Sequence, residues 1–210
     1  MLTPQLIAEI IGVTASGALS PGPLTFAVVA GGSRKGARFG ILAATGHMAF
    51  EFPLYLLLGF GAASFFRGRL LRAWVSLLGG AALLAYAALI LYGLVKGSGS
   101  QGAEKAAAAG GFMVGLLFTA LNPYFIIWWA TAGLKLTLDI WGAGGAPVLV
   151  AAYPFHVWMD YAWLGSLALL AYRGRRLSER LMDAVQVVLA VLLVYYGWVF
   201  LSEGAALLSG

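Results

Sequence analysis

The sequence predicts an all-α integral membrane protein with six transmembrane helices, arranged as two inverted three-helix repeats with helices 1 and 4 broken at midplane. Apolar residues make up 61% and charged residues 10% of the 210 residues, whereas soluble domains average about 45–50% and about 25%. Six apolar segments are long enough to cross a bilayer, which takes about 20 residues. Proline-containing breaks and His–acid pairs recur at matching places in the two halves.

The first and fourth segments each contain a break. The six predicted spans are about 5–33, 39–64, 73–95, 106–134, 146–172 and 183–203. The first is interrupted by Ser20-Pro21-Gly22-Pro23, where proline removes a backbone donor and glycine tolerates unusual dihedrals. The fourth contains Asn122-Pro123, and asparagine before proline also favours a break. The third and sixth segments are ordinary apolar spans.

The second and fifth segments carry the only two histidines, each followed by an acid four residues later. The pairs are His47 with Glu51 and His156 with Asp160. Positions i and i+4 share one face of a helix, so each pair is expected to interact directly. An ionisable group at the centre of a membrane helix costs about 2.5–3.5 kcal/mol and is usually functional. We therefore expect these four residues to bind and release a coupling proton or cation.

A Gly/Ser-rich linker, about 97–105, divides the single membrane domain 1–210 into repeat 1, about 1–96, and repeat 2, about 106–210. Three spans is an odd number, so two homologous halves would have opposite orientations in the membrane. This is the plan of many secondary transporters, in which paired broken helices mark the binding site.

The basic residues predict the orientation of the chain. Nine of them follow the first, third and fifth spans: Arg34, Lys35, Arg38, Lys96, Lys105, Arg173, Arg175, Arg176 and Arg180. Four lie on the other side: Arg67, Arg69, Arg72 and Lys135. The larger group is expected in the cytoplasm, which places both termini outside the cell (plasma) membrane. No basic residue precedes Arg34, so no cleaved leader is expected.

The broken helices are expected to bind the substrate. Opened backbone is tolerated at membrane depth where it is buried or lines a cavity. The half-helices that begin near Pro23 and Pro123 present positive dipole ends that suit a carboxylate, and Thr119 is a polar partner nearby. Tyr153 lies on the same helix face as His156 and can donate a hydrogen bond. The predicted substrate-binding residues are Ser20, Pro21, Gly22, Pro23, Asn122, Pro123 and Tyr153.

Other classes of protein fit the sequence less well. Cysteine is absent, which excludes disulfides, iron–sulfur clusters and thiolate–metal sites. The zinc-protease spacing His-Glu-x-x-His is also absent, so we expect no enzyme, no cofactor and no resident metal. The basic residues lie between hydrophobic runs rather than among surface aromatics, so no nucleic-acid partner is expected. The sequence leaves open whether the chain acts as a monomer or as a homodimer.

Several motifs resemble those of the LysE/RhtB-type amino-acid exporter family. They are Ser20-Pro21-Gly22-Pro23, Gly36-x₃-Gly40 and Gly46-His47 in the first half, and Gly115, Asn122-Pro123 and Asp160-Tyr161-Ala162-Trp163 in the second. The resemblance implies a six-span exporter of amino acids, driven by a gradient of H⁺ or Na⁺. It also implies a central site formed by Pro21, Gly22, Pro23, Asn122, Pro123 and Asp160.

Two features depart from the family pattern and leave the substrate open. Many relatives have a basic residue where this chain has Tyr124, and Glu51 maps to no family position. Two acids favour a basic amino acid, but they serve proton coupling with a neutral one equally well. The alternative function is a divalent-cation transporter that uses the two His/carboxylate pairs as ligands.

Overall fold

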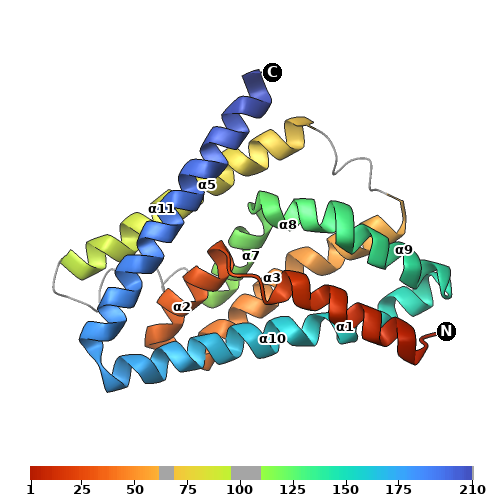
Figure 1. Cartoon of the computed structure of the whole chain (residues 1–210), viewed down its shortest axis with the longest axis horizontal. Coiled ribbons are helices and arrows are strands. Elements are labelled where there is room, and N and C mark those ends of the chain that lie inside the picture. Colours follow the sequence, from red (N-terminus) through yellow and green to blue (C-terminus); the bar gives the residue numbers. More distant parts are fainter. Residues whose placement is uncertain (62–68, 96–109, 210) are drawn as a thin grey trace.

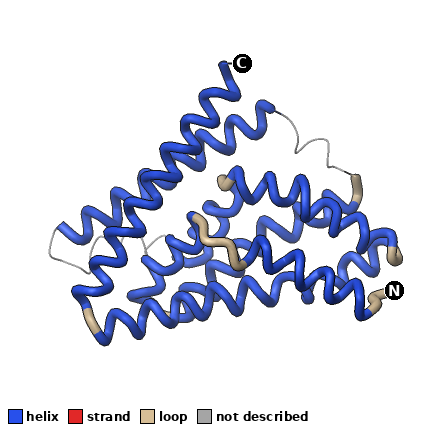
Figure 2. Tube along the Cα trace, viewed as in Figure 1, coloured by secondary structure: helices blue, strands red, loops and turns tan. Residues whose placement is uncertain are grey.

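The computed structural model describes residues 1–61, 69–95 and 110–209, which are almost entirely helical and contain no strand. Figures 1 and 2 show the arrangement of these helices. In chain order they are α1 (Pro4–Ala18), α2 (Pro23–Lys35), α3 (Ala37–Gly59), α5 (Arg69–Val95), α7 (Gly110–Ala120), α8 (Pro123–Trp128), the π-helix η1 (Trp129–Gly133), α9 (Leu134–Gly142), α10 (Gly145–Leu177) and α11 (Glu179–Ser209).

The first predicted span is broken into α1 and α2. Thr3 caps α1 by accepting a hydrogen bond of 3.2 Å from the backbone N–H of Leu6. Pro4 follows in the first turn, where a helix loses nothing from a missing N–H. The helix ends at Ala18, and α2 starts at Pro23 with its axis bent by 72° from that of α1. The predicted interruption of the first helix is confirmed.

The second broken span runs through α7, α8, η1 and α9. The Asn122 side chain caps α8 by accepting a hydrogen bond of 3.0 Å from the Tyr124 N–H, and the bend at this break is 59°. The helix continues to Gly142, so the predicted end at 134 is wrong. It continues because residues of α9 such as Leu136 and Ile140 form a buried face. Single π-helical turns such as η1 are frequent at functional sites.

Glycines let the helices around the site approach one another closely. α3 packs against α7, where a Cβ on Gly46 would lie 1.9 Å from the Phe112 carbonyl oxygen. A Cβ on Gly115 would lie 1.9 Å from the Ala43 carbonyl oxygen. α10 packs against α2 and α3, and α5 lies along α11 (Figure 1). Each of these packings joins a helix from one half of the chain to a helix from the other.

Three helices are long and apolar enough to cross a bilayer: α3, α5 and the 186–209 part of α11. Each bent pair adds one candidate, which gives up to five in the described part of the chain. α10 has 33 residues but carries buried His156 and Asp160, and it is not among these candidates. The all-α class is confirmed, while the six spans and the inverted repeat stay predictions. The predicted linker, 97–105, lies outside the described residues.

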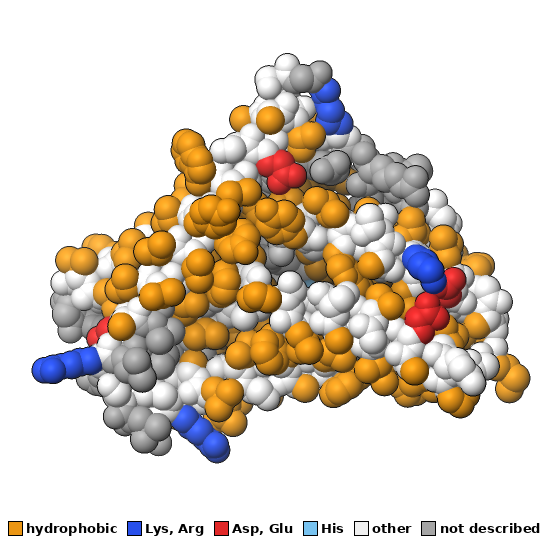
Figure 3. Space-filling view, in the orientation of Figure 1, with side chains coloured by type: hydrophobic (Ala, Val, Ile, Leu, Met, Phe, Trp, Pro, Cys, Tyr) orange, Lys and Arg blue, Asp and Glu red, His pale blue; other side chains and the backbone are white. Residues whose placement is uncertain are grey.

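Several connections between helices lie at two opposite sides of the molecule. Figure 1 places the α2–α3 and α10–α11 connections toward the lower left, and the N-terminus and the α9–α10 connection at the right. The N-terminal amino group donates a hydrogen bond to the Ala143 carbonyl oxygen. Hydrophobic side chains cover most of the face in Figure 3, and Lys and Arg lie toward its edges. This pattern fits a multi-pass membrane protein. The side of the membrane that each terminus faces stays a prediction.

Candidate functional site

A cavity of about 320 Å³ lies between the two helix breaks. This volume is at the lower end of the roughly 300–1,000 Å³ of small-molecule pockets, so it suits one solute of amino-acid size. Both breaks line it, with residues 20–23 from the first and Asn122 from the second. Hydroxyl-bearing and aromatic side chains line much of the rest: Thr14, Ser16, Thr25, Thr119, Phe118, Tyr124, Phe125, Trp128, Trp129 and Tyr196.

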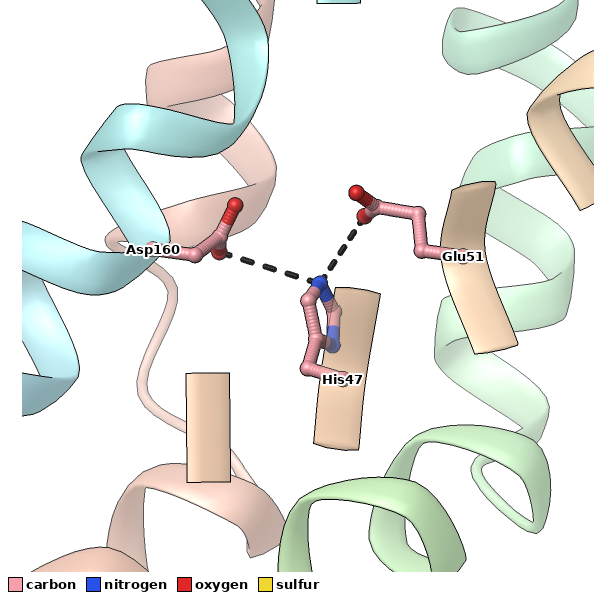
Figure 4. A group of neighbouring side chains, drawn as sticks. All are labelled: His47, Glu51 and Asp160. Carbon is pink, nitrogen blue, oxygen red and sulfur yellow. Dashed lines mark hydrogen bonds and ion pairs between the residues drawn. The ribbon is translucent and has the colours of Figure 1, made fainter. Parts of the chain in front are cut away.

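Glu51 lies at the centre of a buried polar cluster on one wall of this cavity. Its side chain is almost fully buried, and its Oε2 is 2.8 Å from His47 Nε2. Its Oε1 accepts a hydrogen bond of 2.9 Å from the Tyr153 hydroxyl and lies 3.2 Å from His156 Nε2. Asp160 Oδ1 lies 3.8 Å from His47 Nε2, and Figure 4 shows both carboxylates pointing toward this imidazole.

The outer nitrogen of each imidazole meets a threonine from the other half of the chain. His47 Nδ1 lies 2.8 Å from the hydroxyl of Thr119, and His156 Nδ1 lies 2.6 Å from that of Thr14. The Thr119 hydroxyl donates its hydrogen to the Gly115 carbonyl oxygen (2.6 Å), so it must accept from His47. His47 therefore carries a hydrogen on Nδ1. The short contact between its Nε2 and Glu51 then requires one further proton, shared between these two groups.

Aromatic rings pack against both imidazoles. Phe125 meets His47 edge-on with ring centroids 5.4 Å apart, and Trp129 meets His156 in the same way at 5.4 Å. Both rings come from the segment that follows the second break, Phe125 from α8 and Trp129 from η1. They cover the cluster with apolar surface, where electrostatic interactions are stronger than in water.

The two breaks differ in how their helix N-termini are satisfied. At the second break the Asn122 side chain caps α8. At the first break the capping position is Gly22, and no side chain in the described part of the chain caps α2. Leu24 and Thr25, in the first turn of α2, line the cavity. The first turn of an α-helix carries backbone N–H groups without intrahelical partners and a positive dipole end, so the chemistry of this uncapped N-terminus suits an anion.

Most of the residues predicted for the site come together. Ser20, Pro21, Gly22, Pro23, Asn122, His47, Glu51, His156 and Asp160 all line the cavity. Pro123 and Tyr153 are not among the lining residues. Pro123 begins α8 directly behind Asn122, and Tyr153 reaches the cluster through its hydrogen bond to Glu51.

The expected direct pairing of His156 with Asp160 is wrong. His156 Nε2 is directed toward Glu51 of the neighbouring helix, and Asp160 approaches His47 instead. The i, i+4 spacing puts two side chains on one face of a helix, but it does not decide which neighbour each of them meets. Here α3 and α10 pack closely enough for Glu51 to take the central position.

The sequence did not single out Thr14. This residue is fully buried in α1 and bonds to His156. A hydroxyl in an apolar helix just before a break is a signal that could have suggested it. However, Ser16 and Ser20 show the same signal without bonding to the cluster, so sequence alone could not separate them.

The model of one known family, described as "LysE type translocator", matches residues 15–204. The matched region contains both helix breaks and all four ionisable groups of the cluster. Neither the curated proteins nor the solved structures gave a match.

Proposed function

The chain belongs to the LysE type translocator family, and we propose that it is a secondary active transporter that exports amino acids or related small amphoteric metabolites. Export would proceed by ion-coupled alternating access, with H⁺ as the coupling ion. The observation that carries this proposal is the buried His–acid cluster in the wall of a cavity bounded by two broken helices.

The cavity offers a separate partner to each charged end of an amino acid. The uncapped N-terminus of α2 suits the carboxylate. Asp160 lines the same cavity, and its Oδ2 is buried without a hydrogen-bond partner. That oxygen suits the ammonium group, because a buried carboxylate gains most from a charged donor. A zwitterionic substrate would thus span the distance between the first break and α10.

The cluster favours a proton over Na⁺ as the coupling ion. Both Glu51 oxygens face imidazole nitrogens, whereas a hard cation such as Na⁺ prefers a shell of oxygen ligands. The His47–Glu51 pair needs one proton to form its 2.8 Å contact. Binding and release of this proton would change the charge beside the substrate. The movement of protons across the membrane would thereby be linked to the export of the amino acid.

The surrounding architecture fits the same mechanism. Both helix breaks adjoin the cavity, and each histidine of one half bonds to a threonine of the other. This crossed pattern is expected of two inverted repeats, about 1–96 and 106–210, that rock against each other around a central site. We place the protein in the plasma membrane with six spans and both termini outside.

A divalent-cation transporter is the weaker candidate. Its support is that ligand atoms of His47, Glu51 and Asp160 lie within 4.8 Å of one another. A bare cation, however, has no use for the anion-binding end of α2 in the same cavity.

Efflux from proteoliposomes tests the main proposal. Vesicles loaded with a panel of labelled amino acids should release at least one of them faster when a pH gradient is imposed. Asp160→Asn and Glu51→Gln should abolish this release while leaving the protein inserted and folded. Asp139→Asn, which removes a surface carboxylate paired with Lys135, is the matched control and should transport normally. Unchanged efflux in both cluster variants would falsify the mechanism.

A further inference from the structure

Two buried atoms of the cluster lack hydrogen-bond partners. They are Asp160 Oδ2 and His156 Nε2, and each residue is only 6% exposed. His156 Nε2 lies 3.2 Å from Glu51 Oε1, but this contact lacks hydrogen-bond geometry. Both side chains project from α10 toward Glu51 and His47, which belong to α3. Buried polar groups are nearly always satisfied, so two such atoms in one cluster need an explanation.

We infer that these atoms are metal ligands, and that the cluster binds one divalent transition-metal ion. Single ligand atoms of His47, Glu51 and Asp160 already lie within 4.8 Å of one another. Metal bonds of about 2.0–2.2 Å to nitrogen and oxygen require these atoms to move closer together. His156 lies outside this group, but its Nε2 is 3.2 Å from Glu51 Oε1, and the same movement toward the metal would bring it in as a fourth ligand.

The contacts around the cluster match those of a metal site. A ligating histidine normally has its second ring nitrogen held by a hydrogen bond, which fixes the ring. Thr119 and Thr14 do this for His47 and His156. Ligating carboxylates are hydrogen-bonded as well, as Glu51 is by Tyr153. Both Nε2 atoms are thereby held toward the centre of the cluster.

The ligand types select the metal. Two imidazoles and two carboxylates suit Zn²⁺, Co²⁺ or Ni²⁺, whereas Mg²⁺ and Ca²⁺ prefer oxygen ligands alone. The chain has no cysteine, and none of the four proposed ligands carries the soft sulfur that favours Cu(I). The site also borders the cavity, so a bound ion keeps a face open to solvent or solute.

A bound metal would tie two helices together. Its ligands come from α3, which carries His47 and Glu51, and from α10, which carries His156 and Asp160. This step rests on the proposed function: if export requires the helices around the cavity to move against one another, a metal bound to both helices holds the transporter in one conformation. Zinc therefore acts as an inhibitor of export and not as its cargo.

Calorimetric titration of the purified full chain with ZnCl₂ tests the site without any transport measurement. We expect saturable binding of one ion, with release of about one proton, measured by comparing buffers of different ionisation enthalpy. Asp160→Asn and His156→Gln should each weaken binding about tenfold or more, while Asp139→Asn should not change it. Thermal melting identifies any variant that fails to fold. If one cluster variant is unfolded, the zinc affinity of the other one tests the site. No saturable binding, or equal affinity in folded cluster variants, overturns the site.

Proteoliposome efflux with added ZnCl₂ tests the inhibitory role. Zinc should inhibit the wild-type protein, and this inhibition should weaken in whichever of Asp160→Asn and His156→Gln retains efflux. Efflux unaffected by bound zinc, or zinc entry into vesicles that contain a zinc-sensitive dye, overturns the inhibitory role. If no amino acid is exported under any condition but zinc still binds, the proposed function fails and the metal site stands.

Discussion

The hydroxyl of Thr119 lies 2.8 Å from Nδ1 of His47, although 72 positions separate the two residues along the chain. The same hydroxyl donates to the Gly115 carbonyl oxygen and so can only accept from the imidazole. By accepting this hydrogen bond, Thr119 of α7 keeps a hydrogen on Nδ1 of His47. Only Nε2, which faces Glu51, can then gain or lose a proton. The tautomer of the proposed coupling histidine is set by the opposite half of the protein.

Replacement of Thr119 should uncouple transport. Thr119→Val keeps the shape of the side chain but removes the acceptor, so the Nδ1 hydrogen of His47 loses its partner. We expect proton-driven efflux to fall about tenfold or more, as for other residues that orient a functional histidine, while Thr119→Ser retains activity. Thr131→Val is the control, because the Thr131 hydroxyl bonds only to carbonyls of its own segment. Equal activity of Thr119→Val and the wild type would remove Thr119 from the mechanism.

Tyr153→Phe should impair coupling while the substrate still binds. The variant removes the hydroxyl that donates to Glu51 Oε1, and an unsatisfied buried acceptor costs about 1–3 kcal/mol. We expect a slower efflux and an altered pH dependence, with the affinity for substrate less affected. Tyr86→Phe removes a buried hydroxyl that donates to the Ala27 carbonyl oxygen, away from the cluster. It should lower thermal stability without changing the pH profile, and identical profiles for both variants would contradict the role of Tyr153.

Replacement of glycine by alanine should affect thermal stability differently at positions 115 and 12. Gly115→Ala places a Cβ 1.9 Å from the Ala43 carbonyl oxygen and forces α3 and α7 apart. Gly12→Ala places its Cβ where no other atom lies within 4 Å. Alanine in a helix is also favoured over glycine by about 0.8–1 kcal/mol. Thermal melting in detergent should show a clear loss for the first variant, and no loss or a small gain for the second. A stable Gly115→Ala would mean that the two helices pack less closely than described.

Asn122 should contribute to both stability and binding, and two variants separate these roles. Asn122→Ala removes the cap of α8, which should cost about 1 kcal/mol of stability. Asn122→Asp keeps a capping oxygen and hence the stability, but adds a negative charge to the cavity wall. The aspartate variant should therefore bind the substrate carboxylate more weakly, as measured by the substrate concentration for half-maximal efflux. Weaker binding in the alanine variant alone would argue against a carboxylate in the cavity that Asn122 lines.

The sequence by itself determined the features that depend on neighbours along the chain. The composition indicated a membrane, and the Pro-Gly-Pro and Asn-Pro motifs at 21–23 and 122–123 predicted two broken helices, because a missing N–H and a ring clash act on the local turn. A single proline does not decide a break, since α3 and α10 continue through Pro53 and Pro154. The spacing of His47 and Glu51 predicted their contact for the same reason, since an i, i+4 pair is set by the pitch of one helix.

Only the tertiary structure decided the contacts between helices. It placed Glu51 between both histidines, turned Asp160 toward His47, and brought Thr14 and Thr119 to opposite sides of the cluster. These contacts depend on how far each helix is shifted and rotated against its neighbour. That register comes from close packing at residues such as Gly46 and Gly115, which no local pattern in a chain with 29 glycines identifies.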